Sequence, residues 1–152
     1  MTKPPDNDRL VIDGPAGALE ALLEVPKDEA VRGVAVVLHP HPLHGGTMQN
    51  KVAHTLARSF VRQGFAALRF NFRGTGASEG AWDEGRGELD DALAAIAWAR
   101  DRYPGQPLWI AGFSFGAAIA IRAAIESAPA GLVSVAPAVR RFADGLETQP
   151  SC

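Results

Sequence analysis

The sequence is poor in cysteine, in clustered charge and in long apolar runs, and each shortage excludes a class of protein. The single cysteine, Cys152, excludes an internal disulfide framework and fits a reducing cytosol. Residues 1–9 lack the apolar core of a signal peptide, and no apolar run approaches membrane-spanning length. The net charge is −2 and the basic residues are scattered, which argues against a nucleic-acid or membrane surface. We therefore expect a cytoplasmic protein without nucleic-acid or membrane partners.

Apolar residues, by contrast, make up 47% of the 152 positions, which is ample for the core of one domain. We expect a disordered tail over residues 1–9, an α/β domain over 10–139 and a polar tail over 140–152. Strand-like and helix-like segments alternate, which favours a mostly parallel sheet with helices on both faces. The expected elements are a short antiparallel hairpin (10–12 and 19–24), buried strands (34–38, 65–70, 108–113 and 131–135) and helices (47–63, 88–102 and one from about residue 115).

The segment Gly112-Phe113-Ser114-Phe115-Gly116 joins an expected strand to an expected helix. A Gly-x-Ser-x-Gly turn in that context is a nucleophile elbow, in which a strained backbone lifts the serine hydroxyl above the sheet. Gly112 and Gly116 should lie where a Cβ would collide with a neighbouring element. The pattern predicts Ser114 as a catalytic nucleophile. The alternative is a glycine-rich turn whose serine merely caps the helix.

The segment His39-Pro40-His41-Pro42-Leu43-His44-Gly45-Gly46 follows the first buried strand and has three interpretations. His39, His41 and His44 could be metal ligands, although no carboxylate or cysteine accompanies them. The segment could instead be an oxyanion loop, in which the prolines hold the His41 amide stiffly and the Phe115 amide supplies the second donor. Packing and turn formation alone are the third interpretation.

Two further features have modest interpretations. The glycine-rich segment Arg73–Gly80 lacks the third glycine of a dinucleotide fingerprint, because Glu79 occupies that position. We therefore expect a tight loop bordering the mouth of an active site rather than a nucleotide site. His54 lies opposite the apolar face formed by Val52, Leu56 and Phe60, which predicts a solvated surface histidine.

With these three loops in order, the chain resembles the α/β-hydrolase superfamily over about residues 10–140. It is most similar to small, lidless bacterial hydrolases with a His-Pro-His-Pro loop. The resemblance rests on residues 39–42, on Arg69-Phe70-Asn71-Phe72-Arg73-Gly74 and on the turn around Ser114. It implies that Ser114 is the nucleophile and that the His41 and Phe115 amides form the oxyanion hole. It also implies that strand 34–38 is central and adjacent to strand 108–113.

The superfamily order continues from the serine to an acid and then to a histidine, and here the sequence departs from the pattern. All four histidines precede Ser114, and Asp144 and Glu147 lie in the polar tail. The chain thus resembles the first two-thirds of such a hydrolase, which predicts a truncated, weakly active or inactive form. His44 is a substitute base if Glu79 or Asp83 orients it. The apolar strand 131–135 is expected at a sheet edge, where it could mediate self-association.

These observations favour a serine hydrolase that cleaves a carboxylic ester, or a similar small acyl substrate, through an acyl-enzyme. No metal or organic cofactor is required for that chemistry. One alternative is a non-catalytic α/β-hydrolase-like fragment or binding module. A second is a metallohydrolase that uses the cluster of His39, His41 and His44. Neither the acyl group nor the alcohol group of a substrate is specified by the sequence.

Overall fold

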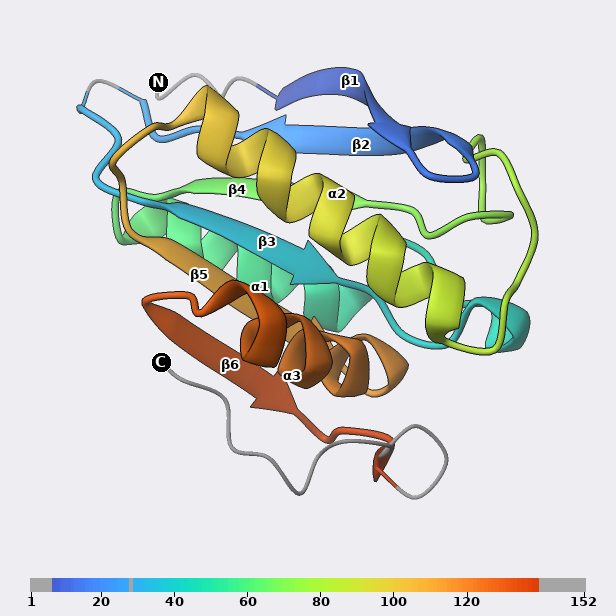
Figure 1. Cartoon of the computed structure of the whole chain (residues 1–152). Coiled ribbons are helices and arrows are strands. Elements are labelled where there is room, and N and C mark those ends of the chain that lie inside the picture. Colours follow the sequence, from blue (N-terminus) through green and yellow to red (C-terminus); the bar gives the residue numbers. More distant parts are fainter. Residues whose placement is uncertain (1–6, 28, 140–152) are drawn as a thin grey trace.

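A computed structural model describes residues 7–27 and 29–139, so the predicted tail over 140–152, with Asp144 and Glu147, lies outside the described residues. The described strands form one sheet in the order β1-β2-β4-β3-β5-β6 (Figure 1). They are β1 (Asn7–Gly14), β2 (Gly17–Glu24), β3 (Val34–Leu38), β4 (Ala66–Phe70), β5 (Leu108–Phe113) and β6 (Gly131–Val135). The helices are the short 3-10 helix η1 (Pro42–His44), α1 (Lys51–Arg62), α2 (Arg86–Arg102) and α3 (Phe115–Ser127).

The sheet confirms the predicted fold class. β1 and β2 form an antiparallel hairpin, and β2 pairs antiparallel with β4. From β4 onward the sheet is parallel, with β3 between β4 and β5 as expected. The hairpin is longer than predicted, because Asn7, Asp8 and Arg9 pair with residues 22–24 although the sequence suggested a tail there.

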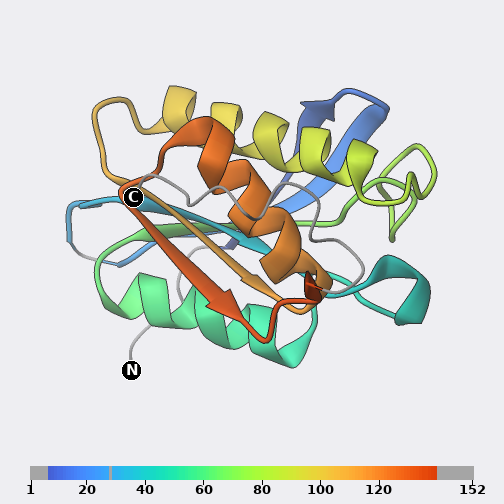
Figure 2. The same cartoon turned by 60° about the horizontal axis from the view of Figure 1, so that its bottom comes forward.

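Helices cover both faces of the sheet (Figures 1 and 2). α2 and α3 lie together on one face, over the larger apolar core, and α1 lies on the other. The most buried residues of α1 are Ala53, Ala57 and Val61, whereas the predicted apolar face of Val52, Leu56 and Phe60 is half-buried. Small side chains let α1 approach the sheet closely, and the larger ones then flank the contact.

Two of the helices, α1 and α2, begin at capping groups that were not predicted. The Asn50 side-chain oxygen accepts hydrogen bonds from the amides of Val52 and Ala53, so α1 begins at Lys51 rather than near residue 47. At the start of α2, the buried Glu88 carboxylate accepts from the amide of Gly85 at 2.9 Å. Side-chain acceptors satisfy amides that have no partner within the helix, and this sets each starting point.

A buried ion pair joins β2 to β4 on the α1 side of the sheet. Arg69 donates to the Glu24 carboxylate at 2.6 Å, and their side chains are 2% and 1% exposed. The Arg69 guanidinium also donates to the carbonyl of Met48 at 2.8 Å. The bond to Met48 holds the segment that leads into α1 against the sheet. Breaking the ion pair would leave an uncompensated buried charge, so Arg69 is held firmly in this position.

His39, directly after β3, has a structural role. Its Nδ1 lies 2.7 Å from the carbonyl oxygen of Pro40, and its Nε2 lies 3.1 Å from the amide nitrogen of Phe72, which donates to it. Nδ1 therefore carries the proton in the neutral ring. Burial lowers the pKa of His39 to about 4, against the opposing effect of the Pro40 hydrogen bond. The ring ties the end of β3 to the segment after β4.

In the turn from β5 to α3, there is no room for a side chain at Gly112 or at Gly116. A Cβ on Gly112 would lie 2.4 Å from the carbonyl oxygen of Gly116. A Cβ on Gly116 would lie 2.3 Å from the carbonyl oxygen of Leu38 and 2.4 Å from that of His39. The expected collisions at both glycines are confirmed, and α3 begins in direct contact with the end of β3.

β1 and β6 form the two edges of the sheet. Self-association through β6 stays a prediction. None of the helices among the described residues is long and apolar enough to cross a membrane.

We expect Gly116→Ala to destabilise the fold by about 3 kcal/mol or more, because its methyl group would meet backbone atoms that have no room to move. Gly105→Ala is the control, since Gly105 has φ +78 and no atom within 4 Å of an added Cβ. That variant should cost about 1 kcal/mol from backbone strain alone. Urea unfolding followed by circular dichroism measures both, and equal losses would contradict the close contact.

A second prediction concerns acid. The pKa of His39 is about 4 in the folded chain and about 6.5 when the chain unfolds. Protonation of His39 therefore favours unfolding. The free energy of unfolding carries about 3 kcal/mol from this difference in pKa, fully present above pH 6.5 and lost as the pH falls to about 4. Unfolding free energies across this range should fall less steeply for His39→Gln than for wild type. The exposed His54 supplies the control: His54→Gln should keep the wild-type slope, and an unchanged slope in His39→Gln would refute the assignment.

Candidate active site

Ser114 has the strained backbone that the sequence predicted. Its φ is 58° and its ψ is −115°, in a region that side-chain-bearing residues rarely occupy. The carbonyl of Val135 accepts from the Ser114 amide at 3.0 Å, and the Ser114 carbonyl accepts from the Ala138 amide at 3.1 Å. The end of β6 and the residues directly after it thus hold the turn in place. Ser114 precedes α3 but makes no side-chain capping bond, which argues against the interpretation as a helix cap.

The segment of residues 39–47, here the His41 loop, lies beside this turn. The contact of Gly116 with the His39 carbonyl places the two backbones together. The ring of His41 lies 5.3 Å from that of Phe115, measured between centroids. The His41 Nδ1 accepts from the amide of Leu43 at 3.1 Å, which shapes the short helix η1. The structure therefore brings His41, Ser114 and Phe115 together at the carboxyl ends of β3 and β5.

Trp82 completes this group of rings and was missed by the sequence analysis. Its ring lies 4.6 Å from His41 and 5.2 Å from Phe115. His44 stacks on the other side of the cluster, 4.3 Å from the His41 ring and 18° from parallel. We call His41, His44, Trp82 and Phe115 the aromatic cluster. No local motif marks Trp82, because three loops distant in sequence meet at this point.

His44 is exposed, and the structure supplies little support for it as a substitute base. Gly46, two residues after His44, is tightly packed, because a Cβ there would lie 2.1 Å from the Pro40 carbonyl oxygen. Glu79 does not orient His44, since its carboxylate accepts from the amide of Ala18 at 2.8 Å. Asp83 lies 3.7 Å from the Arg86 guanidinium in an exposed ion pair.

The metallohydrolase interpretation is not supported by the geometry of the histidines. Both ring nitrogens of His39 are engaged by the backbone. The Nδ1 of His41 accepts from a backbone amide. Within residues 7–27 and 29–139, no three histidine, cysteine or acidic side chains are arranged to hold a metal ion.

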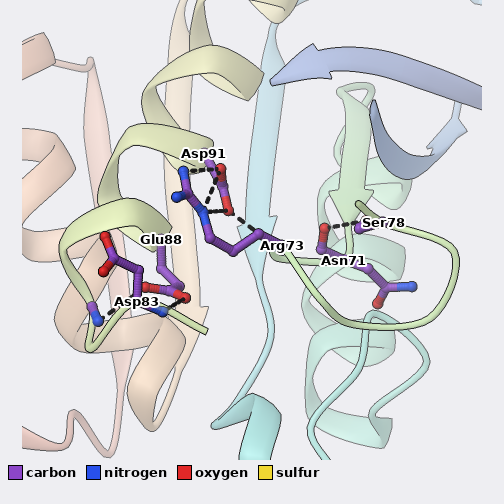
Figure 3. A network of polar contacts seen from close by, with 7 residues as sticks. Asn71, Arg73, Ser78, Asp83, Glu88 and Asp91 are labelled. Atoms are coloured by element: carbon purple, nitrogen blue, oxygen red, sulfur yellow. Dashed lines mark hydrogen bonds and ion pairs between the residues drawn. The ribbon is translucent and has the colours of Figure 1, made fainter. Parts of the chain in front are cut away.

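The segment of residues 73–85, here the Trp82 loop, is fastened to α2 by two buried carboxylates (Figure 3). Arg73 pairs with Asp91 through its guanidinium at 2.8 Å, and its amide donates to the same carboxylate at 2.9 Å. Glu88 accepts from the amides of Asp83 and Gly85. Hydrogen bonding to Asp91 raises the pKa of Arg73 against the effect of burial, and the charges of Asp91, Glu88 and Asp83 raise it further.

The other side of the Trp82 loop is fastened to β2 and β4. The Ser78 hydroxyl donates to the carbonyl of Asn71 at 2.7 Å and accepts from the amide of Glu20 at 2.9 Å. The Glu20 carboxylate accepts from the Asn71 side chain and from the Ala77 amide, both at 2.8 Å. These anchors hold the loop that carries Trp82 at both of its sides.

A groove of about 440 Å³ lies between the two loops. Pro42, Leu43 and residues 45–47 form one wall, and residues 73–76 and 80–82 form the other. The expectation that Arg73–Gly80 borders a binding region is thereby supported. Trp82 lines the groove, and its ring also contacts His41 and Phe115, the residue after Ser114.

Comparison with known proteins agrees with this geometry. A serine hydrolase homologue from Coxiella burnetii is 42% identical, with a TM-score of 0.86 over 93% of this chain and 69% of its own. A lidless α/β serine hydrolase from Xanthomonas campestris is also 42% identical, with a TM-score of 0.86 over 93% of this chain and 66% of its own. An uncharacterized protein of Rickettsia prowazekii is 42% identical over 115 residues, which is 75% of this chain.

The chain spans about half the length of that curated relative, 48%, and about two-thirds of the two solved structures. Its sheet and helices correspond to part of the α/β-hydrolase fold. The model of the family described as serine aminopeptidase, S33, matches residues 32–147. That match covers both loops and the turn at Ser114, and the chain therefore belongs to this family of α/β serine hydrolases.

Proposed function

We propose that the chain carries the nucleophile and the oxyanion hole of an esterase that acts through an acyl-enzyme. The observation that carries the proposal is the backbone of Ser114, with φ 58° and ψ −115° at the start of α3. Strain of about 1 to 3 kcal/mol persists only where the surrounding structure enforces it, and it is concentrated at functional sites. A serine in this turn presents its hydroxyl to a substrate at the carboxyl edge of the sheet.

The second part of the proposal is the oxyanion hole. The amide of Phe115 belongs to the first turn of α3, where backbone donors have no partner within the helix and the helix dipole favours negative charge. The amide of His41 lies between two prolines, which lack an N–H and restrict the backbone. Ring contact between His41 and Phe115 keeps the two residues together. Two such donors would stabilise the negative charge that develops on an attacked carbonyl.

In the proposed reaction, the Ser114 oxygen attacks the ester carbonyl and loses its proton as the tetrahedral intermediate forms. The alcohol then leaves with a proton, and water hydrolyses the acyl-enzyme. A base must accept the serine proton, and none of the four histidines has a supported role there: His39 has both nitrogens engaged, His54 is on α1, and His41 and His44 stack on each other. We therefore propose weak activity for this chain taken alone.

A fluorophosphonate probe tests the nucleophile. We expect slow labelling of the folded chain at Ser114 and none in Ser114→Ala. The oxyanion hole and the strained turn alone are worth on the order of 10³-fold to 10⁴-fold over water. Ser59 is the internal control, because it is exposed on α1 and its hydroxyl donates to the Thr55 carbonyl. Peptide mapping by mass spectrometry locates the label. Equal modification of Ser59 and Ser114, or labelling that requires denaturant, would contradict the assignment.

Turnover tests the base. Hydrolysis of a short-chain activated ester at pH 7–8 should be negligible for this chain, and Ser114→Ala should change it little, since loss of triad members costs on the order of 10⁴-fold to 10⁶-fold. His44→Ala should likewise have no effect. If Ser114→Ala and His44→Ala each lost more than about tenfold from a measurable wild-type rate, Ser114 and His44 would be a working pair and the proposed weak activity would be wrong.

A further inference from the structure

The residues that line the groove between the His41 loop and the Trp82 loop indicate the charge and polarity of the ligand that would fit there. Its volume of about 440 Å³ is within the range of small-molecule sites, roughly 300–1,000 Å³. The walls contain Pro42, Leu43, Ala81 and Trp82, and glycines of both loops expose backbone between them. Among the residues that the structure describes, no acidic side chain lines the groove. A positively charged group would therefore find no counter-ion there.

A negatively charged group is also disfavoured, although Arg73 lines the groove. The Arg73 guanidinium donates to both oxygens of the Asp91 carboxylate, through Nε to Oδ2 at 3.1 Å and through a terminal nitrogen to Oδ1 at 2.8 Å. Asp91 is fully buried, and the Arg73 side chain is 11% exposed. The positive charge is thus already neutralised by a bidentate partner. The groove offers apolar surface and hydroxyl or backbone dipoles, and these suit an uncharged group.

Two residues indicate where that group packs. Leu43 is 63% exposed and lines the groove, so its side chain is available for a ligand to cover. Trp82 contributes the opposite wall, and its ring contacts both His41 and Phe115. A group held between Leu43 and Trp82 would therefore lie against the same indole ring that contacts His41 and Phe115, the two residues whose amides form the proposed oxyanion hole.

We infer that this groove is a subsite for an uncharged apolar chain of the substrate ester, held between Leu43 and Trp82. The inference rests on the proposed esterase function for the identity of the ligand. Each methylene buried in the groove should increase affinity by up to about fourfold. Trp82 then acts as a specificity residue, and the fastened ends of the Trp82 loop keep its ring in place.

Binding is measured without turnover by ¹H–¹⁵N NMR of the full chain, using the indole N–H signals of Trp82, Trp98 and Trp109. Trp82→Phe identifies the Trp82 signal, and the other two serve as internal controls. Butanamide, pentanamide and hexanamide should shift the Trp82 signal saturably, with affinity rising severalfold per methylene. Hexylammonium and hexanoate should bind at least tenfold more weakly than hexanamide. Absence of a saturable Trp82 shift, or tighter binding of either ion, would overturn the inference.

Variants of the groove provide matched controls. Ala81→Phe fills the groove from an exposed position, so hexanamide affinity should fall at least tenfold while the unfolding transition stays unchanged. Leu43→Ala should weaken binding about fivefold. Val11→Ala is its control, because Val11 is 65% exposed on β1 and lies outside the groove. Equal effects of Leu43→Ala and Val11→Ala would overturn the assignment.

The chain bound in the groove could be the acyl group or the alcohol group of the ester. Two fluorophosphonates distinguish these sources, one with a hexyl group attached to phosphorus through carbon and one with hexyl attached through oxygen. Slower labelling of Ala81→Phe with the first assigns the groove to the acyl chain, and slower labelling with the second assigns it to the alcohol. If neither probe labels Ser114, the proposed nucleophile is wrong, while the NMR result decides the groove separately.

Discussion

The candidate site depends on the absence of two side chains, at Gly112 and Gly116. Without a Cβ at these positions, the first turn of α3 lies against the backbone of β5 and against the end of β3. That contact brings Ser114 to the carboxyl edge of the sheet beside the His41 loop. Two hydrogen bonds further restrict the conformation of the serine. Its amide donates to the carbonyl of Val135, the last residue of β6, and its carbonyl accepts from the amide of Ala138, just after β6. The strain at Ser114 is therefore a consequence of close packing around it.

Buried charges among the described residues hold loops in place. Asp91 and Glu88 are fully buried on α2, yet each receives hydrogen bonds from the Trp82 loop. Glu24 is used in the same way, through Arg69, to fix the segment before α1. Buried carboxylates near a candidate site are often taken as acids or bases. Here both oxygens of each of these three carboxylates accept from a backbone amide or an arginine, so positioning is the better explanation of their burial.

The sequence was informative where a feature is local. Apolar runs predicted β3 and β4, and the spacing of two glycines around Ser114 predicted both the turn and its backbone conformation. The sequence failed where partners are far apart. Trp82 joins His41 and Phe115 from a separate loop, and Asp91 meets Arg73 across 18 positions. The sequence also mispredicted the most buried face of α1. This helix carries two apolar rows, one mainly of alanines and one of larger residues, and periodicity alone favours the larger residues as the buried face.

This division between local and distant signals extends to the chemistry. A strained serine and backbone donors at a helix start are specified within a few consecutive residues, so they form wherever the strand, turn and helix fold together. A general base is different, since its side chain must be brought within hydrogen-bonding reach and oriented by a third group. The histidines of this chain are committed to other contacts: His39 to the backbone, and His41 and His44 to the aromatic cluster. The strained serine turn and a base that could activate the serine are therefore separable features, and the described residues, 7–27 and 29–139, contain the first of them.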